Sequence, residues 1–407
     1  MVSKTESIVI VGGGLTAAKA AEKLRSEGFE GTVDIVGAEE QRPYERPPLS
    51  KGYLLGDDEL ESVFVHEASW YDANAIGLRL GSPVVGLDAE SAQLTLENTE
   101  TISYDKLLIT TGSRPRVLVV PGVELDGVHY LRSVDDSKDL RAALETGGQK
   151  VVLVGGGWIG LEVASAARKY GNDVAVVEPQ AMPLRSAIGD ELGGVFAALH
   201  REHGVDLKLG STADEIVGKD GKVTGLRTGD GDVVPADMVI IGVGAIPNSE
   251  FAADAGLLVD NGIVVDAAFR TSHDFIWAAG DVANTFYPRL DRHVRVEHWD
   301  NAIQSGEAAA RSMLGMDVSY DRLPYFFTDQ YDLGMEFTGY LDPDRTYEVA
   351  YVGDPASREF IAFWLDGNRV VAGMNVNVWD VADHIRALIE SGESVDAGRL
   401  AKVAGEW

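Results

Sequence analysis

Apolar and polar positions follow the same order in two separate stretches of the chain. The first stretch opens with four apolar residues, 8–11, passes through three glycines, and then places alanines on one side and charges elsewhere. Gly28 comes next, followed by a second apolar run at residues 32–36. This pattern predicts a buried strand, a glycine turn, a helix that Gly28 ends, and a second strand.

The second stretch lies 143 residues further along the chain. Residues 151–154 form the apolar run, 155–157 the glycine turn, 159–170 the helical pattern and 174–177 the next strand. Each stretch is therefore a strand–helix–strand unit, and two such units predict two nucleotide-binding domains of the α/β class.

The segments outside these two units are richer in strands. From Leu323 onward, short aromatic strands precede a helix near residues 381–391, and this change of character predicts a separate α+β domain with a boundary near residue 322. Further strands are expected within residues 81–96, 106–111, 208–226, 238–242, 263–281, 325–328, 360–365 and 369–375, and an alanine-rich helix at 301–314.

Composition narrows the possible chemistry. The 407 residues carry a net charge of −30 and include no cysteine. The length suggests two or three domains. The absence of cysteine from the sequence removes disulfides, thiolate metal sites, iron–sulfur ligation and dithiol redox chemistry. A strongly acidic chain repels phosphate backbones, so a nucleic-acid partner is not expected.

Membrane and metal signals are weak. No apolar run approaches the ~18 residues of a membrane span, and the apolar stretch before the first glycines is too short for a signal-peptide core. The eight histidines show no HExxH spacing. We therefore expect a cytoplasmic protein with no membrane partner and no metal site.

Both glycine turns fit a dinucleotide-binding pattern. Residues 12–17 (the first glycine turn) read G-x-G-x-x-A, and residues 155–160 (the second glycine turn) read G-x-G-x-x-G. The first glycine of the pattern permits the tight turn, the second lets the backbone approach a pyrophosphate, and the last small residue lets the helix pack closely. Free N–H groups at the helix start then favour phosphate. The predicted positions are Gly12, Gly14 and Ala17 in one turn, and Gly155, Gly157 and Gly160 in the other.

A carboxylate at the end of the second strand of each unit is expected to bind ribose hydroxyls. Glu39 fits this position in the first unit, with Glu40 as a competitor, and Glu178 directly follows the strand in the second. Because Glu178 would repel a 2′-phosphate and no arginine follows before Arg185, NADH is favoured over NADPH. Two glycine turns suggest two cofactors that exchange a hydride, typically NADH and FAD. The residues alone do not say which turn holds which cofactor.

Seven motifs together resemble the FAD-dependent ferredoxin reductases that serve Rieske dioxygenases and haem monooxygenases. The resemblance covers essentially the whole chain and implies a glutathione-reductase-like architecture. It also implies FAD at the first turn and NADH at the second, an FAD domain of residues 1–114 and 248–321, an NADH domain of residues 115–247, and a C-terminal domain of residues 322–407. The motifs are residues 11–17, 46–51, 110–112, 155–162, 244–248, 278–281 and 324–330.

The resemblance also implies roles for individual residues. Asp281, after Gly280, would accept a hydrogen bond from the ribityl chain, and Lys51 would lie near the flavin N5, where a cation stabilises reduced flavin. Glu162 would pair with Lys51 and meet the nicotinamide, unless it is a plain solvent-facing glutamate. The other cofactor-binding positions are Thr16, Arg46, Val84, Arg132, Ile159, Gly244 and Trp299.

Several of these assignments leave alternatives open. Arg46 would support the pyrophosphate or order its loop, and Arg132 would contact the flavin nucleotide or pair with Asp135 or Asp136. Val84 and Trp299 could be core residues. Two positions depart from the family pattern: Phe327 stands where relatives often carry tryptophan, and Ala38 where they often carry an acid.

The resemblance implies a two-step electron relay. NADH gives a hydride to FAD, and reduced FAD passes single electrons to a transiently bound [2Fe–2S] ferredoxin. A basic patch of Arg289, Arg292, His293 and Arg295 could dock an acidic ferredoxin, or could be a solvated loop. The alternatives are a rubredoxin or small-oxidant reductase of the same fold, or a slow redox-sensing flavoprotein. A monomer or homodimer is expected.

Overall fold

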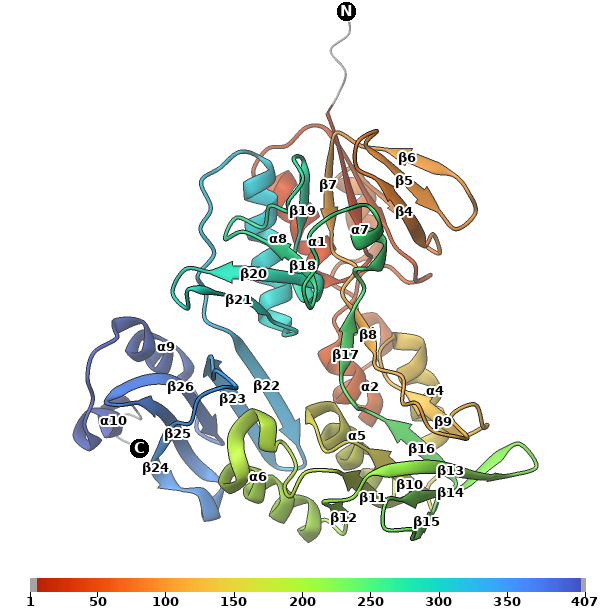
Figure 1. Ribbon diagram of the computed structural model, residues 1–407, viewed down its shortest axis with the longest axis vertical. Coiled ribbons are helices and arrows are strands. Elements are labelled where there is room, and N and C mark those ends of the chain that lie inside the picture. Colours follow the sequence, from red (N-terminus) through yellow and green to blue (C-terminus); the bar gives the residue numbers. More distant parts are fainter. Residues whose placement is uncertain (1–5, 404–407) are drawn as a thin grey trace, which may run out of the picture. The chain divides into compact units, whose positions relative to one another are not determined.

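The computed structural model describes residues 6–403, which divide into two compact units (Figure 1). The first unit comprises residues 6–45, 60–114 and 245–322, and the second comprises residues 46–59, 115–244 and 323–403. Each unit contains one of the two strand–helix–strand repeats. None of the helices among residues 6–403 is both long and apolar enough to cross a membrane.

The first unit is built on a five-stranded parallel sheet. Its strands run in the order β19-β7-β1-β2-β3, so the first strand of the chain lies at the centre. The four apolar residues of β1 are at most 2% exposed, as expected for a parallel strand covered on both faces. The strands are β1 (Ser7–Val11), β2 (Thr32–Val36), β3 (Ile76–Arg79), β7 (Lys106–Ile109) and β19 (Ile276–Ala278).

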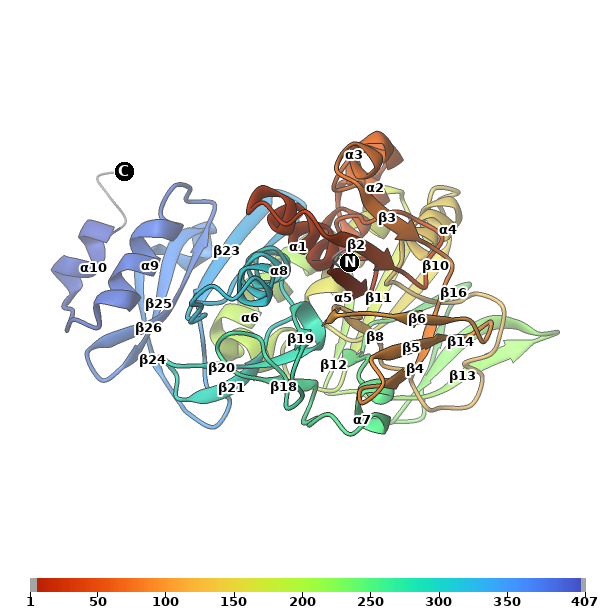
Figure 2. The ribbon, with the colours of Figure 1, turned by 90° about the horizontal axis from the view of Figure 1, so that it is seen from above.

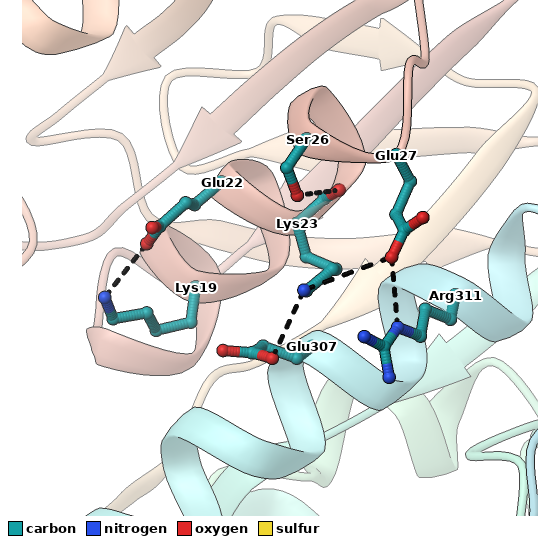
Figure 3. A network of polar contacts seen from close by, with 7 residues as sticks. All are labelled: Lys19, Glu22, Lys23, Ser26, Glu27, Glu307 and Arg311. Atoms are coloured by element: carbon teal, nitrogen blue, oxygen red, sulfur yellow. Dashed lines mark hydrogen bonds and ion pairs between the residues drawn. The ribbon is translucent and has the colours of Figure 1, made fainter.

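Helix α1 (Leu15–Ser26) connects β1 to β2 and packs along α8 (Trp299–Met313). Its alanines are fully buried, whereas its polar side carries the ion pairs drawn in Figure 3. The Lys23 ammonium lies 3.5 Å from the Glu307 carboxylate of α8, and the Arg311 guanidinium lies 3.2 Å from Glu27. Each of these two pairs joins residues that are 284 positions apart in the sequence.

Two small sheets and short helices complete the first unit. The antiparallel sheet β4-β5-β6 precedes β7, and the sheet β18-β20-β21 follows residues 115–244 of the second unit in sequence. The bounds are β4 (Val84–Asp88), β5 (Gln93–Leu96), β6 (Thr101–Ser103), β18 (Ile263–Val265), β20 (Ala283–Tyr287), β21 (Arg292–Arg295), α3 (Ala68–Ala73), α7 (Glu250–Asp254) and the 3₁₀ turns η2 (Leu60–Val63) and η3 (Gly280–Val282). The short strands β8 (Ser113–Pro115) and β17 (Ala245–Pro247) form a two-stranded ribbon where the chain passes between units.

The second unit repeats the parallel architecture with strand order β12-β11-β10-β16-β9. Helix α5 (Trp158–Lys169) joins β10 to β11, and the three-stranded sheet β13-β14-β15 precedes β16. The bounds are η1 (Pro47–Ser50), α2 (Gly52–Leu55), β9 (Val128–Tyr130), α4 (Val134–Leu144), β10 (Lys150–Val154), β11 (Asp173–Glu178), α6 (Arg185–Glu202), β12 (Asp206–Leu209), β13 (Ala213–Lys219), β14 (Lys222–Thr228), β15 (Val233–Pro235) and β16 (Met238–Ile241).

The C-terminal part of the second unit is an antiparallel sheet with helices α9 and α10 beside it (Figure 2). Phe360 and Trp364 pack with residues of α6, while Ile361 and Phe363 pack with residues of α9. Alternate residues of one strand therefore face two different cores, which explains the unbroken apolar run. The bounds are β22 (Tyr325–Gln330), β23 (Leu333–Gly339), β24 (Glu348–Asp354), η4 (Pro355–Ser357), β25 (Glu359–Asp366), β26 (Arg369–Val376), α9 (Ala382–Ser391) and α10 (Ala397–Val403), and the strand order is β22-β23-β26-β25-β24.

The α/β fold class is confirmed, whereas several elements went unpredicted. Helices α4 and α6 and strands β23 and β24 were not expected, and α8 begins at Trp299 rather than at residue 301. Helix α6 contains non-helical backbone at Gly189, and its three glycines, at 189, 193 and 194, lower the helix propensity of its sequence. Strand β23 is almost entirely buried, and its glycines at 334 and 339 weaken the strand signal of its sequence.

Candidate functional site

The first glycine turn leads into α1 and leaves room for a ligand at the helix start. Gly12 has φ +112°, and a Cβ at this position would lie 2.2 Å from the Thr110 carbonyl oxygen, so no other residue fits. A Cβ on Gly14, by contrast, would meet nothing within 4 Å. Gly14 is the N-cap of α1 and supplies no side-chain hydrogen bond to it. The first N–H groups of α1 therefore have space for a pyrophosphate, which fits the predicted site.

The residues predicted to surround this turn lie close to it in the first unit. Thr16 and Ala17 are buried at the start of α1. A Cβ on Gly280 would fall 2.5 Å from the Thr16 hydroxyl, so the Gly280–Asp281 turn approaches the helix closely. The Ser113 hydroxyl donates to the Asp281 carboxylate at 3.3 Å. This hydrogen bond within the protein holds the Asp281 carboxylate in place, and the residue is only partly buried.

The two competing ribose carboxylates differ in their surroundings. Glu39 is partly buried and accepts a hydrogen bond from the Tyr44 hydroxyl. Glu40 is exposed and lies against Gly81. The fixed orientation of Glu39 favours it as the ribose ligand. Two other predicted residues sit at element starts and are partly buried, Val84 at the start of β4 and Trp299 at the start of α8.

The second glycine turn has the same geometry. A Cβ on Gly155 would lie 2.4 Å from the Gly242 carbonyl oxygen, and one on Gly160 would lie 2.3 Å from the Gly155 carbonyl oxygen. A Cβ on Gly157, the N-cap of α5, would meet nothing within 4 Å. Ile159, the second residue of α5, is 49% exposed. The turn therefore offers open backbone N–H groups beside an exposed apolar side chain, which suits a dinucleotide.

Glu178 is fixed beside the second glycine turn by two backbone hydrogen bonds. One carboxylate oxygen accepts from the Gly156 N–H at 2.7 Å, and the other accepts from the Gln180 N–H at 2.9 Å. Arg185, the first arginine after Glu178 in the sequence, is paired with Asp190 at 2.9 Å. The carboxylate is thus fixed beside the turn, at the position predicted for the ribose-binding acid. Gly244, after β16, is exposed.

A buried ion pair joins the Arg46–Lys51 motif to helix α5 within the second unit. The Lys51 ammonium lies 2.7 Å from Glu162 Oε1, and the two side chains are 14% and 4% exposed. The interpretation of Glu162 as a solvent-facing glutamate is therefore wrong. The Ser50 hydroxyl donates to Glu162 Oε2, and the Thr328 hydroxyl donates to Oε1 at 2.5 Å. Three donors thus surround one carboxylate.

Ser50 and Thr328 were not predicted as site residues. Both stand inside motifs that carried the family resemblance, residues 46–51 and 324–330, and this was the available signal. Phe327, the residue that departs from the family pattern, presents its ring 5.2 Å from the Lys51 ammonium. That distance permits a cation–π contact. Phe327 therefore contacts the lysine that pairs with Glu162.

The two predicted arginines of the second unit contact each other. Arg46 donates a hydrogen bond from its guanidinium to the Arg132 carbonyl oxygen. The Arg132 backbone N–H donates to Asp136 Oδ2 at 3.0 Å, next to the capping box that Ser133 and Asp136 form at the start of α4. The backbone N–H of Arg132 thus contacts Asp136. The hydrogen bond from the Arg46 side chain to Arg132 helps to order the loop that contains Arg46.

The predicted basic patch is partly neutralised. Arg289 lies 3.2 Å from the Asp321 carboxylate, and Arg295 pairs with Glu297. His293 is exposed on β21. Because Arg289 and Arg295 have acidic partners, the patch offers less net positive charge than its sequence suggests.

The sequence is similar to those of known protein families. Residues 6–306 match the sequence profile of the pyridine nucleotide-disulphide oxidoreductases, and residues 325–405 match that of a reductase C-terminal domain. The ferredoxin–NAD(+) reductase component of the anthranilate 1,2-dioxygenase system from Burkholderia cepacia is 41% identical over 97% of both chains. The chain belongs to the ferredoxin reductases of the pyridine nucleotide-disulphide oxidoreductase family.

Further reductases also match nearly the whole chain. The reductase in the crystal structure of a covalent putidaredoxin reductase–putidaredoxin complex superposes with a TM-score of 0.93 at 34% identity, covering 97% of this chain and 95% of that one. A rubredoxin–NAD(+) reductase from Pseudomonas putida is 34% identical over 91% of this chain and 96% of its own length. The chain is thus an oxidoreductase whose relatives use pyridine nucleotides. Since its sequence has no cysteine, it lacks the dithiol to which the family name refers.

Proposed function

We propose that this protein is an NADH-dependent ferredoxin reductase that holds FAD at the first glycine turn and NADH at the second. The observation that carries the proposal is the duplicated geometry: two helix starts with open space at Gly14 and Gly157, each followed by a fixed carboxylate, Glu39 or Glu178. The named reductases that match nearly the whole chain support it.

Each group of residues has a defined task in this proposal. Amide N–H groups at the starts of α1 and α5 bind the two pyrophosphates, and the carboxylates bind the riboses. When bound, NADH supplies a hydride, and FAD accepts it and releases electrons one at a time, as a one-electron carrier requires. Asp281 and Trp299 are assigned to the flavin side. The flavin roles of Thr16, Arg46, Val84 and Arg132 stay predictions.

Glu162 and Lys51 form the part of the second unit that is assigned to the nicotinamide. An ionised carboxylate has about four lone-pair positions, and Lys51, Ser50 and Thr328 occupy three of them. The remaining position can accept a hydrogen bond from the carboxamide N–H of a nicotinamide. Glu162 would thereby orient the ring, while the Lys51 ammonium at 2.7 Å balances the charge of the buried carboxylate.

The family resemblance also supports specific domain bounds, a partner, a location and an oligomeric state. We place the FAD domain at residues 1–114 and 248–321, the NADH domain at 115–247 and the C-terminal domain at 322–407, although residues 46–59 cluster with the second unit. The partner is a [2Fe–2S] ferredoxin that docks transiently, as redox partners usually do. We place the protein in the cytoplasm, where NADH is available, as a monomer or homodimer.

The acceptor is tested by direct competition. The purified protein is expected to show the absorbance bands of bound flavin and to reduce cytochrome c with NADH much faster when a [2Fe–2S] ferredoxin is added. Rubredoxin is the second candidate because one relative carries that name, so it is assayed in parallel. Equal, slow rates with either carrier and without one would refute the reductase function.

The role of Glu162 is tested with a double-mutant cycle. Removing one partner of a buried ion pair costs about 3–5 kcal/mol of unfolding free energy, whereas replacing both costs much less. We therefore expect Glu162→Gln and Lys51→Met each to be destabilised, and the double variant to regain much of the stability. All three should reduce flavin with NADH at least about tenfold more slowly, measured by stopped flow. A double variant that is both stable and fully active would remove the pair from the proposed function.

A further inference from the structure

A row of polar side chains runs from Glu162 into the interior of the second unit. Thr328 and Gln330 lie on β22, and His200 lies on α6. All three side chains are at most 1% exposed. Thr328 and Gln330 are two residues apart on one strand and so project from the same face, whereas Asp329 between them is exposed. Buried polar groups of this kind need partners, and here they satisfy one another.

The distances define a continuous hydrogen-bond chain. Thr328 Oγ1 lies 2.5 Å from Glu162 Oε1, and Gln330 Nε2 lies 3.1 Å from Thr328 Oγ1. His200 Nε2 lies 2.8 Å from Gln330 Oε1, and the Tyr331 hydroxyl approaches His200 Nδ1 at 3.5 Å. The first three links are of ordinary length, and the last is weak.

One condition fixes the direction of every link. Glu162 forms an ion pair with Lys51 at 2.7 Å, and the carboxylate of an ion pair only accepts hydrogen bonds. The Thr328 hydroxyl must therefore donate its single proton to Glu162 and accept from the Gln330 amide. The amide oxygen of Gln330 then faces His200, so His200 must carry its proton on Nε2.

The neutral form of His200 agrees with this assignment. Burial lowers the pKa of His200 to about 4, so the ring is uncharged at neutral pH. Its Nδ1 then keeps a lone pair toward the Tyr331 hydroxyl. All donors consequently point toward Glu162, and such aligned hydrogen bonds polarise one another.

We propose that Thr328, Gln330 and His200 are positioning residues, forming a one-way hydrogen-bond chain that holds the Glu162 carboxylate in the orientation it needs to receive the nicotinamide. The hydrogen-bond chain thereby links the C-terminal sheet and α6 to the Glu162 carboxylate on α5. The inference rests on the role proposed above for Glu162, and adds three residues that do not touch the cofactor themselves.

The first test reads the proton position directly, without any turnover. Nitrogen-15 NMR of the histidine rings in the flavin-loaded protein, with the His200 signal identified by its loss in His200→Gln, is expected to show the Nε2–H tautomer. An Nδ1–H tautomer or a charged ring at pH 7 would overturn the proposal. The tautomer is read on the unaltered protein, and the His200→Gln variant, checked for bound flavin and thermal unfolding, serves only to assign the signal.

The second test uses a matched set of threonine variants. Thr328→Val removes the donor but keeps the shape, Thr328→Ser restores a hydroxyl, and Thr338→Val is the control. Thr338 is also 1% exposed, on the neighbouring strand β23, and its hydroxyl finds no hydrogen-bond partner within residues 6–403. We expect kcat/KM for NADH to fall roughly tenfold or more in Thr328→Val, and to stay within about twofold of the original in the other two. Flavin absorbance and thermal unfolding confirm that each variant is folded.

These variants distinguish a failure of the hydrogen-bond chain from a failure of the role proposed for Glu162. Equal kcat/KM in Thr328→Val, Thr328→Ser and Thr338→Val would refute the hydrogen-bond chain. If Glu162→Gln were impaired in that case, the role of Glu162 would still stand. If Glu162→Gln itself left NADH kinetics unchanged, the proposed function of Glu162 would fail as well.

Discussion

Replacing Gly157 by alanine separates cofactor binding from folding. The added Cβ would meet no protein atom within 4 Å, so it occupies only space that a ligand would use. Two small effects on stability oppose each other. Alanine reduces the entropy of the unfolded chain and so stabilises by about 0.4–1 kcal/mol, but it is a poorer N-cap than glycine, by up to about 1 kcal/mol. The free energy of unfolding should therefore change by less than about 1 kcal/mol.

The effect on NADH should be much larger. A Cβ at Gly157 moves the pyrophosphate away from the first N–H groups of α5, and hydrogen bonds to charged groups contribute about 1.5–3 kcal/mol. Losing one such bond corresponds to a roughly ten- to 150-fold higher KM for NADH, measured at saturating electron acceptor. Bound flavin should remain, because the first glycine turn is unaltered.

Two further glycine variants serve as controls for this prediction. Gly155→Ala places a Cβ 2.4 Å from the Gly242 carbonyl oxygen at a φ of +106°, so it should lose at least about 2 kcal/mol of stability in urea unfolding. Gly14→Ala should lower flavin retention instead of raising the KM for NADH. A Gly157→Ala enzyme that keeps its KM within about twofold would refute the assignment of the second glycine turn to NADH.

Two other predictions concern charge. Glu178→Ala removes the carboxylate that would face a 2′-phosphate, and at an effective dielectric near 20 that repulsion amounts to roughly 3–4 kcal/mol; the ratio of kcat/KM for NADH over NADPH should fall at least about tenfold, and an unchanged ratio would contradict the role of Glu178. Because the pKa of His200 is lowered to about 4 and an unfolded histidine titrates near 6.5, the unfolded chain binds a proton first as the pH falls. The unfolding free energy should then decrease by roughly 3 kcal/mol between about pH 6.5 and pH 4 through this group. Urea unfolding of the wild-type protein and His200→Gln over this range tests it, and identical pH slopes would count against the burial of a neutral ring.

The sequence predicted the parallel sheets well because their signals are local. The apolar run, the glycine turn and the helical pattern lie within about 30 residues in each unit, and the small residues of the turns have geometric reasons that the structure bears out, as the Gly160 contact shows. The C-terminal sheet was only partly predicted. Strand β25 was predicted from its apolar run, whereas β23, with glycines at 334 and 339, was not.

The hydrogen-bond chain could not be predicted from local patterns. Glu162 and Thr328 are 166 residues apart, and His200 and Gln330 are 130 apart. A threonine, a glutamine and a histidine in apolar surroundings carry no periodic signal of their own. Only the packing of β22 and α6 against α5 reveals that these side chains share one polar row.

The buried Lys51–Glu162 pair is better explained by chemistry than by stability. Bringing two charges out of water costs several kcal/mol for each ion, and apolar residues of similar volume are often equally or more stabilising. Stability alone therefore does not explain why Glu162 is 4% exposed and accepts hydrogen bonds from Lys51, Ser50 and Thr328. The arrangement does supply an acceptor whose direction and charge are fixed before any ligand arrives. Such preorganisation is valuable where a nicotinamide ring must be oriented for hydride transfer, and it accounts for why so many polar residues are committed to one buried glutamate.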